Sequence, residues 1–487
     1  MMDSTVTENI LGTSLVPTIM GVLVGKSYSN DKLDLLYVTT AVGITIATAT
    51  SALSLQLRWM SKSRNQLTIL TTATLTLSLI ASIVSFHLVR HNFSPSRIYQ
   101  LPENLRDQRI SDSNDVFRYH FYTDFIPGFI LFSQAQLCSL IIFDLMNRAK
   151  RNFALSEAFI VAQLVSGTYL IWALTTYSSL TDAGPFRVEQ TTSILLNVGM
   201  IFCVLVFAPS YLLIKTSNSF MKYSTLVLGI FASYVVTQNT IRTAKIGDPF
   251  TWLVDYIFAT HQRISLFSLW LSTLAACVSF STSWSHMVGQ TNSLVRKVFH
   301  LATCVVFISG YNQDLDFTAF AAGGMFILMA ILETIRAWNL WPIGYQLERV
   351  CQSLRGRWDN RYLTLSHIYL LVGMMIPVWL IPSSESNKLV LSSGLISLGV
   401  GDTAAAVIGT FYGKSQISPK SKKTVEGLVG NILAMALFKQ IWVGYSGFLD
   451  EFSFAMAAVL TAFAEATSLQ CDNLVLPLVM ILALEIF

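Results

Sequence analysis

The amino-acid sequence predicts an all-α fold, a polytopic bundle of transmembrane helices with about 13 to 15 spans. The first observation is the composition: of 487 residues, 53% are hydrophobic and 12% are charged, and the mean hydropathy is +0.55. Such a chain has too little polar surface to cover a soluble globule of this size. The second observation is the length of the apolar stretches, and the third is the placement of the basic residues between them. The net charge of +4 does not indicate a nucleic-acid partner.

Polar interruptions divide the chain into about fifteen apolar stretches, and a membrane-spanning helix needs about 20 apolar residues. The first eight spans are expected near residues 10–25, 33–57, 67–90, 121–145, 153–177, 190–214, 223–240 and 262–283. The remaining seven are expected near 298–311, 316–336, 364–382, 388–412, 428–443, 447–469 and 471–487. The first stretch lacks the basic region and the cleavage site of a signal peptide, so we expect it to be retained.

Basic residues gather in alternate loops between these stretches. The loops on one side hold Arg58, Lys62, Arg64, Arg148, Lys150, Arg151, Lys215, Lys222, Arg296, Lys297, Arg349, Arg355, Arg357, Arg361, Lys414, Lys420, Lys422 and Lys423. The turns on the opposite side hold Asp314, Asp316, Glu385, Asp450 and Glu451, with Arg242 and Lys245 as weak exceptions. Because cytosolic loops carry an excess of Lys and Arg, we expect the basic side to face the cytosol.

The six cysteines are relevant to metal and redox sites. They occur singly, mostly inside apolar stretches, without C-x-x-C spacing or a paired histidine. This distribution favours neither a disulfide framework nor a zinc site.

The most informative segment is GDTAAAVIGTFYGK at 401–414, which is followed by KKTVEG at 422–427. Asp402 stands near the end of an apolar stretch, where an ionisable group is costly and usually functional. The next loop has no acidic residue before Glu426, and its lysines are suited to binding phosphate groups. These lysines are Lys414, Lys420, Lys422 and Lys423. The segment therefore predicts a polyanion site at a membrane face.

The signs of charge in this segment allow more than one interpretation. Lysines alone are also explained by stop-transfer charge and attraction to anionic lipid. Asp402 and Glu426 favour a metal site, because acids beside a basic phosphate site are natural ligands for Mg²⁺ bridging nucleotide oxygens. A Walker A loop is excluded because GTFYGKS at 409–415 has three positions between its glycines where four are needed.

Small residues recur through the same segment. They suit close packing of a helix against its neighbours, and they equally suit the approach of loop backbone to a ligand. These residues are Gly399, Gly401, Ala404, Ala405, Ala406, Gly409 and Gly413.

Three other segments are expected on the same side of the membrane. RKVFH begins one span, LTLSHIYLL begins another, and EATSLQCDNLVLP lies near the C-terminus. Their candidate residues are Arg296, Lys297, His300, His367, Glu465, Asp472 and Asn473. The histidines are equally explained as buried structural residues, and the basic pair as interfacial anchors. Four separated segments at one face nevertheless indicate a composite site.

These segments resemble the dolichol kinases, and more broadly the polyprenol and phytol kinases related to CTP-dependent membrane cytidylyltransferases. The resemblance covers about residues 294–480 and rests on RKVFH, LSHIYLLVG, LGVGDTAAAVIGTFYGK, KKTVEG and EATSLQCDNLVLP in that order. It implies an endoplasmic reticulum enzyme that transfers the terminal phosphate of CTP to dolichol, giving dolichyl phosphate and CDP for protein glycosylation. Residues 1–290 carry none of these motifs and are expected to be scaffold, whereas 291–487 are expected to form the CTP-binding and catalytic region.

By resemblance and by charge, each candidate residue receives a role. Asp402 and Glu426 are expected to hold Mg²⁺ or another divalent cation, and Asp402 is expected to be essential as a metal ligand or as a base. The catalytic candidates are Asp402, Glu426, His300 and Asp472. The nucleotide-binding candidates are Gly401, Thr403, Gly409, Gly413, Lys414, Lys422, Lys423, Thr424 and Gly427. The supporting candidates are Arg296, Lys297, His367, Glu465 and Asn473.

Two alternatives stay open beside this interpretation. A related enzyme would be another prenol or phytol kinase or a membrane cytidylyltransferase. A transporter would show inverted repeats and charges near the bilayer midplane, whereas the distinctive charges here gather at one face. The resemblance is also incomplete, because GRWDNRYLTLSH carries Asp359 as its sole acidic residue where the family is expected to carry more.

Overall fold

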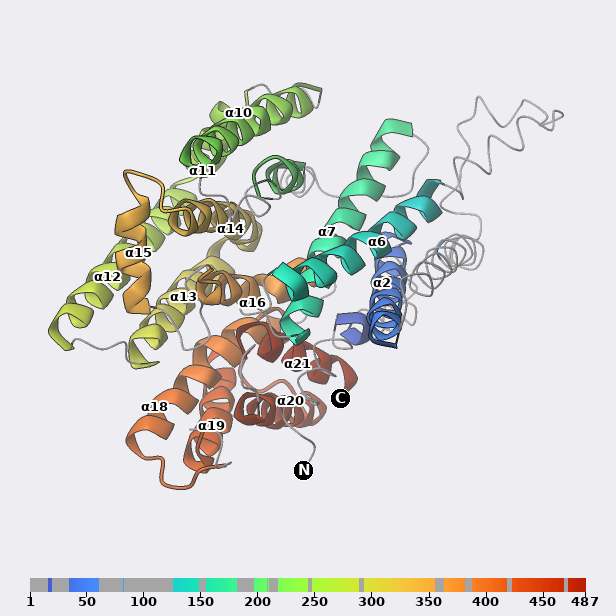
Figure 1. The fold of residues 1–487 in the computed structure, drawn as a ribbon. Coiled ribbons are helices and arrows are strands. Elements are labelled where there is room, and N and C mark those ends of the chain that lie inside the picture. Colours follow the sequence, from blue (N-terminus) through green and yellow to red (C-terminus); the bar gives the residue numbers. More distant parts are fainter. Residues whose placement is uncertain are drawn as a thin grey trace. The chain divides into compact units, whose positions relative to one another are not determined.

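The chain folds into helices throughout the part that the computed structural model describes. The described residues are 16–19, 35–60, 82, 126–148, 155–181, 197–207, 209, 218–243, 248–288, 293–354, 363–381, 388–417, 423–467 and 472–487. Within them, every element is helical apart from an isolated antiparallel bridge between Gln416 and Thr424. The predicted all-α class is therefore confirmed (Figure 1).

The chain divides into two compact units, Met1–Ser193 and Ile194–Phe487. All the motifs singled out in the sequence lie in the second unit. The predicted functional boundary near residue 290 also falls inside that unit. The division into a scaffold and a catalytic region concerns function and stays a prediction.

The first unit packs its helices through small residues and interhelical hydrogen bonds. A side chain at Gly43 would bring its Cβ within 2.5 Å of Leu170 Cδ2, so the two helices approach closely there. Gln163 Nε2 donates a hydrogen bond to Thr48 Oγ1 at 2.9 Å. Both devices are typical of membrane helices, which gain no hydrophobic stabilisation from leaving lipid. The helices concerned are α2 (Leu35–Met60), α6 (Ile126–Arg148) and α7 (Leu155–Thr181).

The second unit holds the remaining described helices. The first of them are η2 (Cys203–Phe207), α10 (Ser219–Thr243), α11 (Pro249–Phe258), α12 (His261–Val288), α13 (Ser293–Gln313), α14 (Leu315–Ala337) and α15 (Gly344–Leu354). They are followed by α16 (Ser366–Leu380), α17 (Lys388–Leu391), η3 (Leu395–Asp402), α18 (Thr403–Phe411), α19 (Val425–Trp442), α20 (Phe448–Thr467) and α21 (Asp472–Ile486).

Helix starts in this unit follow local capping rules. The carboxylate of Asp314 accepts a hydrogen bond from the Phe317 amide at 2.8 Å and caps α14. The Thr424 hydroxyl accepts one from the Gly427 amide at 3.2 Å and caps α19. Both side chains satisfy amides that have no partner within the helix. Thr424 therefore fixes where the KKTVEG segment turns into a helix.

Several helices are apolar enough to cross a membrane. Among the described residues, four are long enough: Ile126–Met146, Glu157–Tyr177, His261–Ser281 and Leu315–Ala337. Shorter apolar helices cover Val38–Ala52, Asn197–Val206, Ser366–Leu380 and Leu395–Phe411. These helices are consistent with a polytopic membrane protein. Most of the predicted spans 10–25 and 67–90, and parts of 190–214, lie outside the described residues, so the number of spans stays a prediction.

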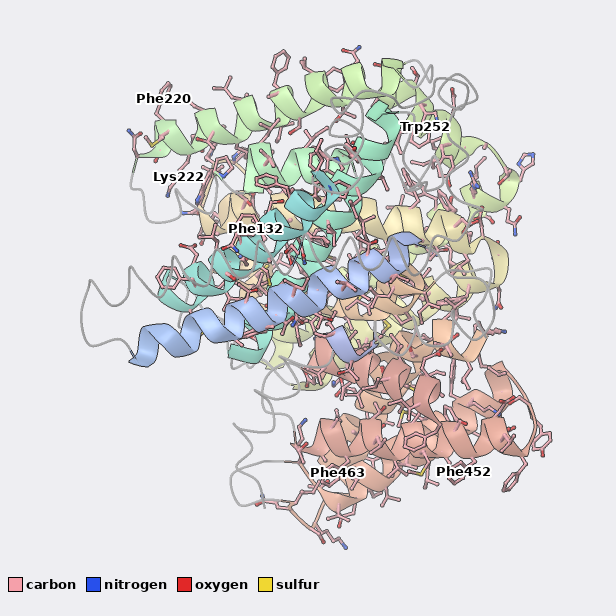
Figure 2. The ribbon with its side chains drawn as sticks, turned by 90° about the vertical axis from the view of Figure 1, so that its right-hand side faces the viewer. Phe132, Phe220, Lys222, Trp252, Phe452 and Phe463 are labelled. Atoms are coloured by element: carbon pink, nitrogen blue, oxygen red, sulfur yellow. The ribbon has the colours of Figure 1, made fainter. Side chains whose placement is uncertain are left out.

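The outer faces of the helices are apolar as well. On α19, a stripe at four-residue intervals is 48% to 75% exposed and consists of Val429, Leu433, Leu437 and Ile441. Figure 2 shows Phe220 on α10 and Phe452 and Phe463 on α20, all of which are exposed. Apolar surface of this extent is rare on soluble proteins, and lipid is its natural environment.

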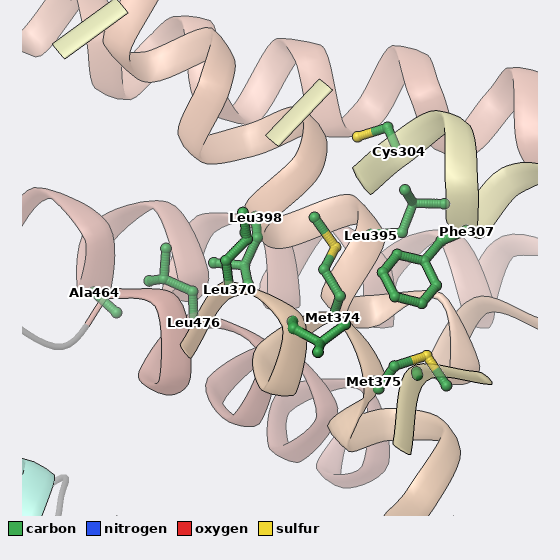
Figure 3. Packing of buried hydrophobic residues seen from close by; sticks show 11 residues of the cluster. Cys304, Phe307, Leu370, Met374, Met375, Leu395, Leu398, Ala464 and Leu476 are labelled. Atoms are coloured by element: carbon green, nitrogen blue, oxygen red, sulfur yellow. The ribbon is translucent and has the colours of Figure 1, made fainter. Parts of the chain in front are cut away.

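A buried cluster inside the second unit joins five of the C-terminal helices and α14 (Figure 3). Cys304 and Phe307 come from α13, Leu395 and Leu398 from η3, and Met374 from α16. Further members are Ala322, Leu370, Leu371, Met375, Ala464 and Leu476. Because burial of such side chains contributes about 1.5 to 3 kcal/mol each, this cluster holds η3 against α13, α16, α20 and α21.

The contact between η3 and α16 requires glycine. A Cβ on Gly394 would lie 2.6 Å from the carbonyl oxygens of Gly373 and Met374 and 2.9 Å from Met374 Cα. Gly324 on α14 is a matched control, because a Cβ there would meet nothing within 4 Å. We expect Gly394→Ala to destabilise the protein by about 2 kcal/mol through overpacking. Gly324→Ala should be neutral or slightly stabilising, because alanine favours helix over glycine.

Thermal unfolding of both variants in detergent measures this difference. Equal unfolding midpoints for the two variants would show that η3 and α16 do not pack at this distance.

Candidate functional site

Asp402 ends the π-helix η3 and stands directly before α18. Two residues of η3, Leu395 and Leu398, are fully buried in the cluster described above, so the helix has little freedom to move. Wide turns of this kind are rare and frequent at functional sites. Asp402 itself is 3% exposed. A buried ionised carboxylate at the end of an apolar helix requires partners.

Two side chains of α13 provide those partners. The ammonium of Lys297 donates a hydrogen bond to Asp402 Oδ2, and His300 Nε2 lies 3.3 Å from the same oxygen. The two residues are three apart on the helix and therefore share a face. Since a carboxylate oxygen accepts hydrogen bonds, His300 must carry its proton on Nε2 to bind it. The predicted convergence of RKVFH with GDTAAAV is thus present.

Helix α21 adds a third segment to this cluster. Asn473 Oδ1 lies 3.4 Å from His300 Nε2, and Asn473 Nδ2 donates to the carbonyl oxygen of Ser366 at 3.3 Å. Asn473 therefore links the first turn of α21 to the start of α16. His367, also in the first turn of α16, packs edge to face on Phe299 with the ring centroids 5.6 Å apart.

Lys423 brings the KKTVEG segment to the same place. Its ammonium lies 2.8 Å from Glu465 Oε1 on α20 and also donates to the Glu465 carbonyl oxygen. Burial by itself would lower the pKa of Lys423, but the negative charges of Glu465, Asp472 and Asp402 outweigh burial and raise it. Lys423 is therefore a cation that contacts Glu465 directly and is stabilised by the negative charges of Asp472 and Asp402.

Glu426 lies in a different environment. Its two carboxylate oxygens accept hydrogen bonds from the Ser415 amide at 3.1 and 3.2 Å. The backbone amide of Glu426 itself is the largest cause that lowers the pKa of this carboxyl, and the amides of Ser415 and Lys414 add to it. Glu426 thus holds the end of the GTFYGKS segment, and its described contacts do not include Asp402.

The lysine loop is closed by backbone pairing on both sides. The Val425 amide donates to the Ser415 carbonyl oxygen at 2.9 Å, and the Ile417 amide donates to the Lys423 carbonyl oxygen at 3.0 Å. Lys414 is exposed at the start of this loop. Lys420 and Lys422 lie outside the described residues, as does the side chain of Arg296.

The glycines of the segment have packing reasons to be glycine. A Cβ on Gly413 would lie 2.7 Å from Thr424 Cγ2. A Cβ on Gly427 would lie 2.9 Å from the Ala405 carbonyl oxygen, and one on Gly409 would lie 3.1 Å from Thr424 Oγ1. Close packing of α18 on the start of α19 therefore accounts for these three residues, and their predicted contact with a nucleotide stays a prediction.

Asn431 is a polar residue of the site region that none of the sequence motifs pointed to. This residue of α19 is buried, and a Cβ on Gly401 would collide with its Oδ1. The available signal was an amide inside an otherwise apolar helical stretch, GLVGNILAMALF at 427–438. Polar residues in such helices often mark contacts with other helices or with substrate.

The described residues thus form a buried cluster of opposite charges beside an exposed basic loop. The cluster brings together Lys297, His300, Asp402, Asn473 and, through Lys423, also Glu465 and Asp472. Among the described residues, no three His, Cys, Asp or Glu side chains are grouped so that they could hold a metal ion by themselves. The cationic side chains of this arrangement can bind an anion, and its carboxylates can accept a proton. Because the groups are buried, both events would be shielded from bulk water.

Comparisons with known proteins point to one family. The chain is 30% identical to the dolichol kinase of Homo sapiens over 313 residues, which is 59% of this chain and 57% of the relative. It is 30% identical to the dolichol kinase EVAN of Arabidopsis thaliana over 238 residues, 47% of this chain and 42% of the relative. It is 25% identical to the dolichol kinase sec59 of Schizosaccharomyces pombe over 315 residues, 61% of each.

The chain spans less than two thirds of the length of these relatives. No family model matches the chain, and no solved structure matches it. The named relatives bear out the resemblance that the ordered motifs predict, and they support assigning the chain to the dolichol kinase family.

Proposed function

We propose that the protein is a CTP-dependent dolichol kinase. It transfers the terminal phosphate of CTP to the hydroxyl of dolichol, giving dolichyl phosphate and CDP for protein glycosylation. The reaction takes place at the cytosolic face of the endoplasmic reticulum membrane, as the basic loops on one side of the predicted topology favour.

The observation that carries this proposal is the buried cluster around Asp402. Phosphoryl transfer needs positioning and neutralisation of charge more than covalent chemistry. Asp402 supplies a carboxylate, Lys297 supplies a cation in contact with it, and Lys423 supplies a second cation in contact with Glu465. The groups come from four separated segments of the chain, and all four contain motifs that carry the family resemblance.

In the proposed reaction, the acceptor oxygen attacks the terminal phosphorus of CTP and the bond to the β-phosphate oxygen breaks. The hydroxyl proton passes to a base in the cluster, and Asp402 is our candidate for this role if it is not the metal ligand. Lys297 and His300 hold this carboxylate ionised and oriented through its Oδ2. Lys423 and Lys422 neutralise the phosphates, and Lys414 extends the basic loop.

A divalent cation can be held here by protein carboxylates together with the phosphates of the substrate. Mg²⁺ is usually held by one or two carboxylates together with substrate phosphates, so a three-residue protein cage is not required. Asp402 would be one ligand, since both of its described polar contacts use Oδ2. For Glu426 to be the second ligand, its carboxylate would have to give up the Ser415 amide from which it accepts in the described structure. The cation would neutralise charge on the transferred phosphate.

The acceptor explains why such a site stands on membrane helices. Removing a polyprenol tail from the bilayer costs about 0.8 kcal/mol per CH₂, so its hydroxyl must react at the interface. The second unit presents exposed apolar faces on α10, α12, α19 and α20. These faces keep the helices in lipid, where the acceptor resides.

A labelled-CTP assay with dolichol, phytol and phosphatidate side by side tests the proposal. Label from the γ-phosphate in dolichyl phosphate supports a dolichol kinase, and preference for another alcohol indicates a different prenol kinase. Label from the cytidine monophosphate moiety in lipid would identify a cytidylyltransferase. Uptake of substrate into sealed vesicles without CTP turnover would identify a transporter.

Asp402→Asn should lower prenol phosphorylation by at least about 100-fold, because the base or metal ligand is lost. The substitution leaves the buried ammonium of Lys297 without its carboxylate, which by itself is destabilising. The double variant Lys297→Met with Asp402→Asn removes both charges and serves as the control for folding. It should unfold at a higher temperature than Asp402→Asn alone and be equally inactive. Substantial activity in Asp402→Asn would remove Asp402 from the mechanism.

Lys422→Ala combined with Lys423→Ala should raise the KM for CTP by roughly tenfold and leave the KM for the prenol nearly unchanged. The reason is that the phosphates of CTP lose two cations. Lys388→Ala is the matched control, because Lys388 lies on α17 and its ammonium contacts the Trp442 ring at 3.8 Å. An unchanged CTP dependence in the double variant would refute the assignment of the phosphate site.

A further inference from the structure

Asn431 has buried hydrogen-bonding capacity that the described structure does not use. The residue is 1% exposed. Within the described part of the chain, neither Asn431 Nδ2 nor Asn431 Oδ1 has a hydrogen-bond partner. Leaving a buried donor or acceptor unpaired costs about 1 to 3 kcal/mol each, and such groups in native proteins call for an explanation.

The amide faces the residue next to Asp402. A Cβ added to Gly401 would collide with Asn431 Oδ1 and would lie 3.0 Å from Met435 Sδ, so η3 and α19 meet at this point. On the other side of Asp402, the hydroxyl of Thr403 is also buried and has no hydrogen-bond partner among the described residues. Two unused polar groups therefore lie at the residues that precede and follow Asp402 in the chain: Asn431 packs against Gly401, and Thr403 carries its own unpaired hydroxyl.

The chemistry of these groups selects the partner. An amide donates through Nδ2 and accepts through Oδ1, so a partner that both donates and accepts satisfies it fully. A phosphate oxygen accepts hydrogen bonds, and it would leave Asn431 Oδ1 unpaired. An alcohol donates its O–H to Oδ1 and accepts from Nδ2 through its oxygen. The neighbouring residues Gly401 and Met435 have no polar side-chain group. Such surroundings suit a hydroxyl at the end of a hydrocarbon chain.

The position of Asn431 along α19 also favours a lipid alcohol over the phosphates of a nucleotide. Asn431 lies six residues beyond Val425, the first residue of α19. At 1.5 Å per residue it stands about 9 Å further along the helix than the lysine loop. A nucleotide held by its phosphates at that loop would not need this amide. A lipid alcohol approaching along the apolar part of the helices would pass it.

We propose that Asn431 binds the hydroxyl of the lipid alcohol and presents it to Asp402. The assignment rests on the proposed kinase function and adds the residue that recognises the acceptor. The amide has no hydrogen-bond partner among the described protein groups, so it is available to bind the acceptor. An apolar residue of the same shape would pack equally well at this position.

Asn431→Leu tests this assignment with CTP and dolichol as the probes. We expect the KM for dolichol to rise by roughly tenfold, since one or two hydrogen bonds to the acceptor are lost. The KM for CTP should change by less than about twofold. The thermal unfolding midpoint should stay the same or rise, because replacing an unpaired buried amide by an apolar group of similar shape removes a cost. Leu433→Met, on the exposed stripe of α19, is the volume-conserving control and should leave both KM values unchanged.

An unchanged KM for dolichol in Asn431→Leu would overturn the assignment. A rise in the KM for CTP alone would also overturn it, because Asn431 would then serve the nucleotide. If Asn431→Leu does not fold, Asn431→Thr replaces the amide by a single, shorter hydroxyl and should show the rise for dolichol in milder form; no rise would refute the proposal. Wild-type protein that transfers no phosphate from CTP to any prenol would overturn the kinase function as well, which separates the two failures.

Discussion

The ion pair between Asp402 and Lys297 is the interaction on which the rest of the candidate site depends. A carboxylate that is 3% exposed at the end of an apolar helix is tolerated when a cation and hydrogen-bond donors lie beside it. Lys297 and His300 meet this need from α13, and Asn473 extends the network to α21. Any arrangement of these helices that separated them would leave a buried charge without compensation.

Apolar packing holds this network in place. The cluster around Met374 fixes η3 between α13, α16 and α21, and Gly394 allows the backbones of η3 and α16 to approach. Since lipid provides no hydrophobic stabilisation between helices, close packing of small residues and interhelical polar contacts must supply specificity. The same close packing and interhelical polar contacts that hold the second unit together therefore also hold the site residues in place.

Several features followed from residue types and spacing alone. The composition indicated a membrane protein, because a soluble fold of this size cannot cover so much apolar surface, and the length of the apolar stretches indicated helical spans. The ordered motifs indicated that RKVFH, GDTAAAV, KKTVEG and CDNLVLP act together, and the contacts of Lys297, Asp402, Lys423 and Asn473 agree. Glu426 shows the limit: its charge and proximity in sequence suggested a ligand beside Asp402, whereas its described bonds are to the Ser415 amide.

The sequence by itself determined which chemical groups this protein possesses and which kind of solvent surrounds it, since both depend on composition and on local order along the chain. The tertiary structure decided which groups face one another. The π-helical turn at 395–402 orients Asp402 toward Lys297, and the approach of α19 to this turn brings Asn431 against Gly401, the residue before Asp402. Such orientations depend on packing between residues more than one hundred positions apart in some cases, as for Lys297 and Asp402, and no local pattern encodes that distance.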